Sequence, residues 1–133
     1  MTFIDTGILV GALLEKHPEH SQCRTALEKF ADCFTDAHAL AETFATLTGF
    51  YKVPNDVAAE LILGLRETLL IRPIPLTDYE TAIRLAQSRG VMGGGIYDSL
   101  HATFARRKRA SRIVTRNPSH FAHTAPDLEI LTP

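Results

Sequence analysis

The sequence predicts an α/β fold, with a short, mostly parallel central sheet of about four or five strands flanked by helices. Short apolar runs typical of buried strands alternate with longer segments whose apolar residues recur at helical spacing. The chain has 133 residues, of which 45% are hydrophobic and 22% charged, as expected for one globular domain. Parallel strands joined by helices form right-handed crossovers, so we expect helices on both faces of the sheet in a single domain spanning residues 1–133.

Five short segments are predicted to be strands. They cover residues 2–4, 33–35, 71–76, 112–115 and 129–131. The third segment contains Pro73 and Pro75, and proline cannot donate a hydrogen bond to a neighbouring strand. We therefore expect it to be an edge strand or an irregular one.

The segments between the strands are predicted to be helices. They cover about residues 8–14, 18–30, 37–51, 54–65, 77–90 and 96–109. Pro18 and Pro54 suit the first turn of a helix, and Thr77 with Glu80 forms a capping box. Gly90 is typical of a helix end, and the glycines at 93–95 predict a flexible loop before the last helix.

Charge and cysteine content narrow the classes of partner. The formal net charge is -1, so any contact with nucleic acid has to come from a local basic patch. Cys23 and Cys33 have no metal-ligand spacing and are interpreted as reduced thiols in or near the core. The first residues make a poor signal peptide, and no apolar stretch approaches a membrane span. We expect a cytoplasmic protein with no membrane partner.

Four polar residues stand where the predicted fold would place a functional site. Asp5 directly follows the first strand, Asn117 follows the strand at 112–115, and Asp98 begins the helix after the glycine loop. Glu42 lies in the third helix. The carboxyl ends of parallel strands form the binding crevice of such sheets. Taken singly, each residue also has a structural interpretation. Asp5 could cap a helix, and Asn117 could form a turn. Asp98 could be a favourable charge at a helix start, and Glu42 could lie on a solvated helix face.

Taken together, the three acidic residues indicate a cation. Two carboxylates about 4 Å apart repel by roughly 4 kcal/mol at an effective dielectric constant of 20. Three in one pocket require protonation or a bridging ion, and oxygen ligands favour Mg²⁺ or Mn²⁺. Such an ion would hold a phosphodiester and activate a water molecule. The sequence has no Ser-His-Asp or Cys-His arrangement, Walker loop or GxGxxG motif that would favour another chemistry.

Several segments resemble a known family along nearly the whole chain. They are residues 3–6 (FIDT), 41–42 (AE), 93–102 (GGGIYDSLHA), 113–117 (IVTRN) and 120–121 (HF). In these motifs the chain resembles PIN-domain ribonucleases, in particular the toxins of VapBC-type toxin–antitoxin pairs. The resemblance implies a PIN-like three-layer sandwich and a Mg²⁺- or Mn²⁺-dependent endoribonuclease.

The resemblance also implies roles for the site residues. Asp5 and Asp98 match the principal metal ligands, and Glu42 matches the acid that binds metal or positions water. Asn117 stands where the family often has Asp, so we expect one strong metal site and a second filled only with substrate. Thr6 and Thr115 are candidate supporting residues that could hydrogen-bond a ligand carboxylate or water.

Candidate contacts to RNA come from basic residues near the strand ends. Arg112 belongs to the basic run at 106–112, which also suits a helix C-terminus, whereas Arg116 and His120 are better candidates for direct contact with single-stranded or looped RNA. His101 is interpreted as a packed helix residue rather than a catalytic base. The two HxxH motifs lack a third matching ligand for zinc.

Two apolar helices carry the predicted protein contacts. Their apolar residues are Phe44, Leu47, Phe50, Tyr51, Leu61 and Leu65. The simplest interpretation of these residues is packing in the core. The resemblance implies in addition that the two helices form a groove for a cognate antitoxin. It also implies that the protein forms a homodimer or a toxin–antitoxin hetero-oligomer. The alternative function is a catalytically weak PIN-like module that binds RNA or protein. The sequence disfavours a phospho-receiver domain, because the adjacent acids, the phosphoacceptor Asp and the late Lys that such a domain needs are missing.

Overall fold

The computed structural model describes residues 1–133 and contains a five-stranded sheet in which all neighbouring strands are parallel. The strands are β1 (Thr2–Ile4), β2 (Cys33–Asp36), β3 (Leu70–Arg72), β4 (Arg112–Val114) and β5 (Glu129–Leu131), in the order β3-β2-β1-β4-β5. The predicted parallel sheet is confirmed. So is the position of the third strand at an edge, and β3 ends at Arg72, directly before Pro73.

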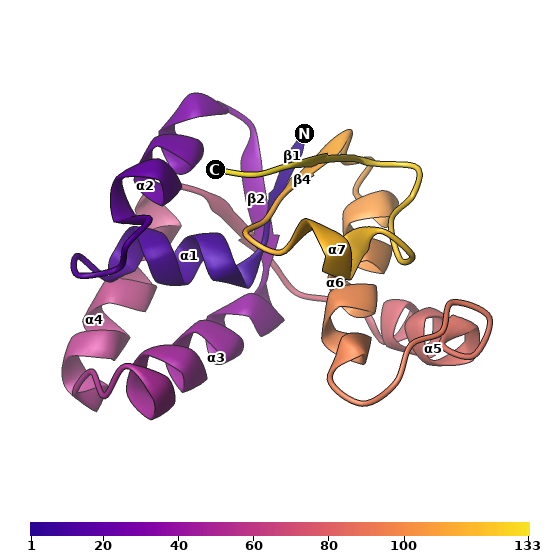
Figure 1. Cartoon of the computed structure of the whole chain (residues 1–133), viewed down its shortest axis with the longest axis horizontal. Coiled ribbons are helices and arrows are strands. Elements are labelled where there is room, and N and C mark those ends of the chain that lie inside the picture. The colour runs from indigo at the N-terminus through magenta and orange to yellow at the C-terminus, as the bar shows by residue number, and fades with distance from the viewer.

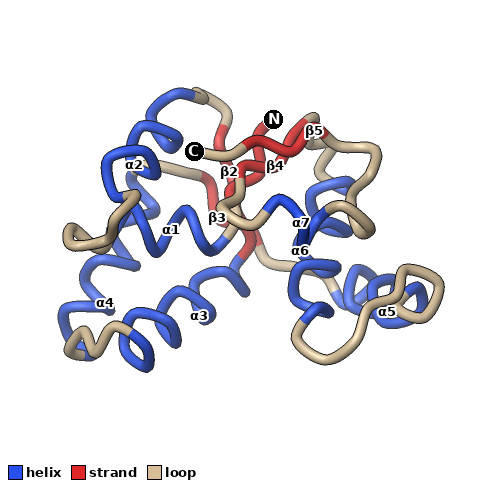
Figure 2. Tube along the Cα trace, in the orientation of Figure 1, coloured by secondary structure: helices blue, strands red, loops and turns tan.

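Seven α-helices cover the sheet. They are α1 (Thr6–Leu13), α2 (His20–Lys29), α3 (Ala37–Ala45), α4 (Asn55–Gly64), α5 (Leu76–Leu85), α6 (Gly95–Arg107) and α7 (Pro118–Phe121). A π-helical turn, Thr46–Phe50, extends α3, and a 3-10 turn, Leu65–Glu67, follows α4. Helices α1 to α4 lie on one side of the strands and α5 to α7 on the other (Figures 1 and 2). The predicted three-layer arrangement is confirmed.

Some predicted helix ends are wrong. Helix α2 begins at His20, and Pro18 lies in the turn before it. Helix α5 begins at Leu76 with Pro75 as its N-cap, so Thr77 already lies in the first turn and makes no capping bond. The same helix ends at Leu85, and Gly90 instead takes a left-handed φ of 65° in the turns that follow. The short α7 was not predicted, because four residues carry too little periodicity.

The core follows from the alternation of side chains along the strands. Phe3 of β1 and Ile113 of β4 face α6 and α7, where they pack with Phe104 and Phe121. Ile4 and its neighbour on β4 face the opposite layer and pack with α1 and α2. Burial on both faces of the sheet explains why each central strand contains a pair of adjacent apolar residues.

Two aspartates at strand ends begin the helices that follow. Asp5 accepts a hydrogen bond from the backbone N–H of Thr6 at 2.8 Å, and Asp36 accepts one from Ala39 at 2.9 Å. These N-caps satisfy backbone donors at the starts of α1 and α3. They also place two carboxylates at the carboxyl ends of β1 and β2.

Other features bear on the environment of the chain. None of the helices combines the length and the apolar composition that a membrane span requires.

Cys23 and Cys33 form no disulfide and are buried, as predicted, and burial raises the pKa of each thiol to about 11. Both thiols are therefore protonated at neutral pH and behave as small apolar groups.

The close approach of α1 and α2 at Gly11 gives a test of the packing. A Cβ at Gly11 would lie 2.5 Å from Sγ and 3.1 Å from Cβ of Cys23. Gly11→Ala should lower the free energy of unfolding in urea by about 1–3 kcal/mol. Gly64→Ala is the matched control: nothing lies within 4 Å and φ is -67°, so a gain of about 0.4–1 kcal/mol is expected. Equal stability of Gly11→Ala and the parent would contradict this packing.

Candidate active site

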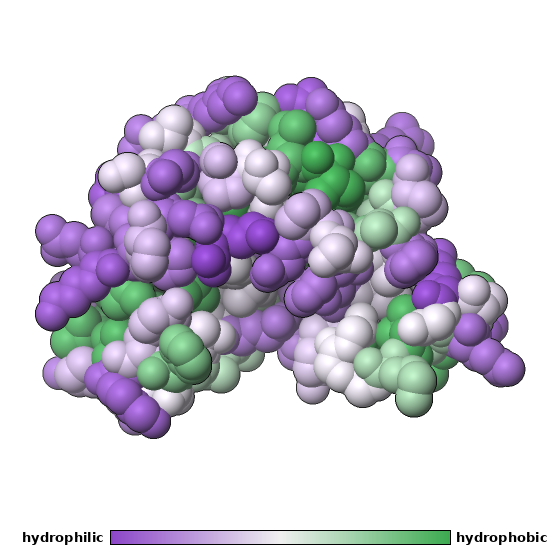
Figure 3. All heavy atoms as spheres, viewed as in Figure 1, coloured by the Kyte–Doolittle hydropathy of each residue, from purple (hydrophilic) through white to green (hydrophobic).

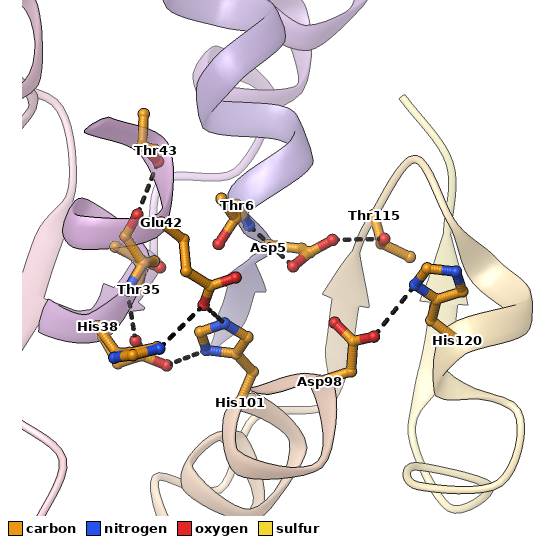
Figure 4. Close-up of polar contacts among 12 residues, drawn as sticks. Asp5, Thr6, Thr35, His38, Glu42, Thr43, Asp98, His101, Thr115 and His120 are labelled. Atoms are coloured by element: carbon orange, nitrogen blue, oxygen red, sulfur yellow. Dashed lines mark hydrogen bonds and ion pairs between the residues drawn. The ribbon is translucent and has the colours of Figure 1, made fainter. Parts of the chain in front are cut away.

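Asp5, Glu42 and Asp98 line one cavity of about 310 Å³. They come from the end of β1, from α3 and from the first turn of α6, and Figure 4 shows the carboxyl groups of Asp5 and Asp98 turned toward a common space. Asn117, three residues after the end of β4, lines the same cavity. The structure thus brings together the four residues selected from the sequence.

The position of the cavity follows from the order of the strands. Strand β1 lies between β2 and β4. The segments that follow β2 and β4 run to opposite sides of the sheet, and this opens a crevice at the carboxyl ends of the strands. In the space-filling view the lower edge of the molecule is hollowed between α3 and α4 on one side and α5 and α6 on the other (Figure 3). Hydrophilic residues gather on the face above this hollow.

Asp5 is fixed by hydrogen bonds to both of its carboxylate oxygens. Oδ1 accepts from the N–H of Thr6, and Oδ2 accepts from the hydroxyl of Thr115 at 2.7 Å. The N–H of Asn117 in turn donates to Thr115 Oγ1 at 3.0 Å. Burial raises the pKa of Asp5, and the bond from Thr115 offsets only part of this effect. Thr115 therefore supports Asp5 directly, and Asn117 contributes a backbone contact to the same network.

The pKa of Asp98, like that of Asp5, is raised by its surroundings. Oδ2 of Asp98 lies 3.1 Å from Nδ1 of His120, as Figure 4 shows. Burial raises the pKa of Asp98, the negative charge of Asp5 raises it further, and His120 lowers it. Glu42 has a smaller effect than Asp5 in the same direction. Asp5 and Asp98 are therefore the more strongly interacting pair, and a cation between them would relieve their repulsion.

Glu42 is held by a buried histidine. His101 Nε2 donates to Oε1 of Glu42 at 2.6 Å, and Nδ1 donates to Oδ2 of Asp36 at 2.5 Å. Burial alone would lower the pKa of His101, but the bonds to the two carboxylates raise it to about 10. The ring is thus an imidazolium at neutral pH with both N–H groups in use. The interpretation of His101 as a packed helix residue is confirmed, and the side chain of Glu42 is 27% exposed rather than fully solvated.

The donor chemistry of the cavity fits a hard divalent cation. No group of three or more His, Cys, Asp or Glu side chains is arranged as a ready-made metal site. Asp5 keeps one free lone pair on each carboxylate oxygen, and Oγ1 of Thr6 is buried in the cavity wall without a partner. Asp5 and Asp98 are the residues that could ligate an ion. Glu42, held by His101, could orient a water molecule beside them.

The basic candidates divide into two groups. Arg116 and His120 line the cavity, and Nε of Arg116 also pairs with Glu19 at 2.9 Å. Arg112 begins β4, whereas the cavity lies beyond the end of that strand. Arg112 instead pairs with Glu129 at 3.4 Å and lies over the ring of another residue, Phe30. Arg112 therefore does not line this cavity, and its contact with RNA stays a prediction.

Sequence reasoning missed two further residues at or beside the site. Asp36, fully buried, anchors His101, and its position directly after a strand was a signal of the same kind as that of Asp5. Tyr97 lines the cavity with 46% of its surface exposed and stacks on His38 at a centroid distance of 5.3 Å. An exposed aromatic ring beside a polar cavity offers a surface on which a base can stack.

The contact between His101 and two carboxylates gives a stability test. His101→Leu leaves Asp36 buried without its cationic partner, so the free energy of unfolding should fall by about 3–5 kcal/mol. Urea unfolding at pH 6 measures the loss. His123→Leu removes an exposed histidine and should leave stability nearly unchanged.

The same contact predicts a pH dependence. The folded-state pKa of His101 is raised from 6.5 to about 10, so its stabilisation is complete below pH 6.5 and disappears as pH rises through about 10. The difference in unfolding free energy between the parent and His101→Leu should therefore narrow over this interval. A difference that stays constant from pH 6 to pH 10 would contradict the imidazolium.

Comparison with known proteins identifies the family. The family model described as PIN domain matches residues 2–125, and no curated protein matches significantly. Three similar solved structures are the sarcin–ricin loop cleaving toxin VapC20 of Mycobacterium tuberculosis, VapBC2 of Rickettsia felis bound to a promoter DNA fragment, and a toxin–antitoxin complex of Klebsiella pneumoniae. Their TM-scores are 0.73, 0.72 and 0.67, at 14%, 19% and 18% identity.

The matches extend over most of each chain. They cover 85%, 99% and 92% of this chain and 87%, 98% and 91% of the respective relatives. At such low identity these likenesses show the fold alone, and the family assignment rests on the family model. Because that model covers nearly the whole chain, this protein belongs to the PIN domain family.

Proposed function

We propose that this protein is a Mg²⁺- or Mn²⁺-dependent endoribonuclease and the toxin of a type II toxin–antitoxin pair. The observation that carries the proposal is the convergence of Asp5, Glu42 and Asp98 in one cavity at the carboxyl ends of the central strands. Membership of the PIN domain family supports it, as does the structural likeness to a toxin described as cleaving the sarcin–ricin loop. Two unbonded cysteines accord with a cytoplasmic location.

The residues of the cavity have complementary parts in this reaction. Asp5 and Asp98 would hold the ion, which when bound polarises the phosphodiester and lowers the pKa of a water molecule. Thr115 keeps the Asp5 carboxylate in one orientation. His101 does the same for Glu42 and leaves its second oxygen free to accept a proton from the attacking water. Asn117 adds no charge, which favours one tightly held ion over two.

Residues at the rim of the cavity suit RNA. Arg116 and His120 can neutralise phosphate charge beside the scissile bond, and Tyr97 can stack on an unpaired base. Stacking requires a base outside a duplex, so single-stranded or looped RNA is the preferred substrate in this proposal.

An apolar groove between α1, α2 and α4 is the proposed antitoxin site, and of the six apolar residues selected from the sequence only Leu61 and Leu65 line it. Its volume is about 450 Å³, and its apolar lining includes Leu13, Leu27, Phe30, Leu61 and Leu65. Its charged rim contains Arg24 and Glu28. An amphipathic antitoxin segment would place apolar side chains in the groove. Phe50, 76% exposed, offers an apolar surface for homodimerisation.

Replacement of a proposed metal ligand tests the reaction. Asp98→Asn should reduce RNA cleavage by at least about 100-fold, because loss of residues that merely support metal ligands already costs 10–100-fold. Its stability without metal should equal or exceed that of the parent, since one repelling charge is removed. Glu60→Gln removes an exposed acid from α4 and should cleave like the parent.

Removal of metal gives the complementary measurement. EDTA should abolish cleavage by the parent, and added Mn²⁺ should restore it. A cleavage rate of Asp98→Asn equal to that of the parent would overturn the site assignment. Failure of the parent to bind Mn²⁺ or to cut any RNA would favour the alternative, a PIN-like binding module without activity.

A charge in the groove tests the antitoxin site. Leu61→Lys should weaken binding of the protein encoded beside this chain at least about tenfold, because a lysine would be desolvated there. Calorimetric titration with that protein measures the change. Ile83→Lys, at a 64% exposed position on α5, is the matched control and should bind normally. Equal affinities of the two variants would exclude this groove as the interface.

A further inference from the structure

A second polar pocket lies between α5 and α6, away from the three catalytic acids. We call it the arginine pocket. It has a volume of about 410 Å³ and no apolar residue in its wall. Its lining residues are Thr77, Asp78, Thr81, Arg89, Thr103, Arg106 and Arg107. A wall of guanidinium and hydroxyl groups is the chemistry that recognises phosphate oxygens.

The positive charge of the arginine pocket is only partly compensated. Arg107 Nε donates to Asp78 at 2.9 Å, and Arg106 pairs with Asp127 through its Nε and Nη2. Arg89 has no carboxylate partner of its own. Three guanidinium groups therefore face two carboxylates, which leaves one net positive charge.

Two of the arginines that line the pocket each have a guanidinium nitrogen without an acceptor. Nη1 of Arg89 and Nη1 of Arg106 are buried and have no hydrogen-bond partner. Burial and the charge of Arg106 lower the pKa of Arg89, and Asp127 offsets this only in part. Buried donors without acceptors are costly, so an anion that supplied oxygens to both arginines would be bound favourably.

The arginine pocket and the active-site cavity both border a third hollow. This intermediate hollow of about 460 Å³ shares Gly94, Asp98 and His120 with the active-site cavity and shares Arg89 with the arginine pocket. From Asp98 to Arg106, α6 advances by about 12 Å at 1.5 Å per residue. A polyanion bound in the catalytic cavity is long enough to extend along this path to the arginine pocket, whereas a single small anion is not.

We propose that the arginine pocket binds a backbone phosphate of the RNA substrate beyond the scissile one, with Arg89 as its principal contact. This inference rests on the proposed ribonuclease function. Arg89 lies where the intermediate hollow meets the arginine pocket, so it holds the strand at the exit from the active site. Longer RNA should therefore bind more tightly than RNA that fills only the catalytic cavity.

Salt dependence of RNA binding tests the proposal. The Asp98→Asn chain, in which we expect RNA cleavage to be strongly reduced, is titrated with single-stranded RNA of two lengths at several salt concentrations. For the longer RNA, Arg89→Gln in this background should reduce the slope of log K against log salt by about 0.7, the value for one phosphate on a single strand. Arg89→Lys keeps the charge and should keep the slope. The shorter RNA should bind all variants alike.

A matched control isolates the pocket from overall charge. Arg84→Gln removes an exposed arginine from α5 with the same change in net charge, and Arg84 lines neither the pocket nor the intermediate hollow. Its slope should equal that of the Asp98→Asn parent. Circular dichroism melting verifies that each variant is folded.

The outcomes separate this inference from the proposed function. Equal slopes for Arg89→Gln and Arg84→Gln, with the parent still cutting RNA, would overturn the inference alone. Inorganic phosphate that binds as tightly as the longer RNA, and only when Arg89 is present, would mark a site for a free anion and also overturn it. A parent chain that neither binds nor cuts RNA would overturn both.

Discussion

Repulsion among the carboxylates of Asp5, Glu42 and Asp98 is the constraint to which the rest of the site is adapted. Burial raises the pKa of Asp5 and Asp98, and the charge of Asp5 adds to the effect on Asp98. Each carboxylate has its own partner: Thr115 for Asp5, His101 for Glu42 and His120 for Asp98. These contacts fix the side chains without removing the excess negative charge, so the cavity still favours a cation.

The same contacts connect the layers of the fold. His101 reaches from α6 to the end of β2 and to α3, because its two nitrogens bond Asp36 and Glu42. Asp5 joins β1 to the residue after β4 through Thr115. The polar network thus ties both helical layers to the central strands, and the geometry of the site depends on the parallel register of β1, β2 and β4. The stability of the fold and the geometry of the site are therefore coupled through this network.

Local sequence signals predicted the parts of this arrangement that depend on neighbouring residues. Asp5 directly follows β1 and Asn117 comes three residues after β4, so their place at one edge of the sheet could be inferred. The burial of Glu42 could not, because it depends on His101, 59 residues away. The distance of Arg112 from the cavity could not be inferred from the basic run at 106–112, because it depends on Arg112 standing at the start of β4. The predicted capping box does not form, because the helix begins at Leu76, directly after Pro75 and one residue before Thr77.

Anomalous diffraction from crystals soaked in Mn²⁺ tests most directly whether the acidic residues share a cation. A shared cation predicts a single strong anomalous peak in the cavity, within coordination distance of both Asp5 and Asp98. A peak that contacts neither aspartate, or none at a Mn²⁺ concentration that supports RNA cleavage, would contradict it.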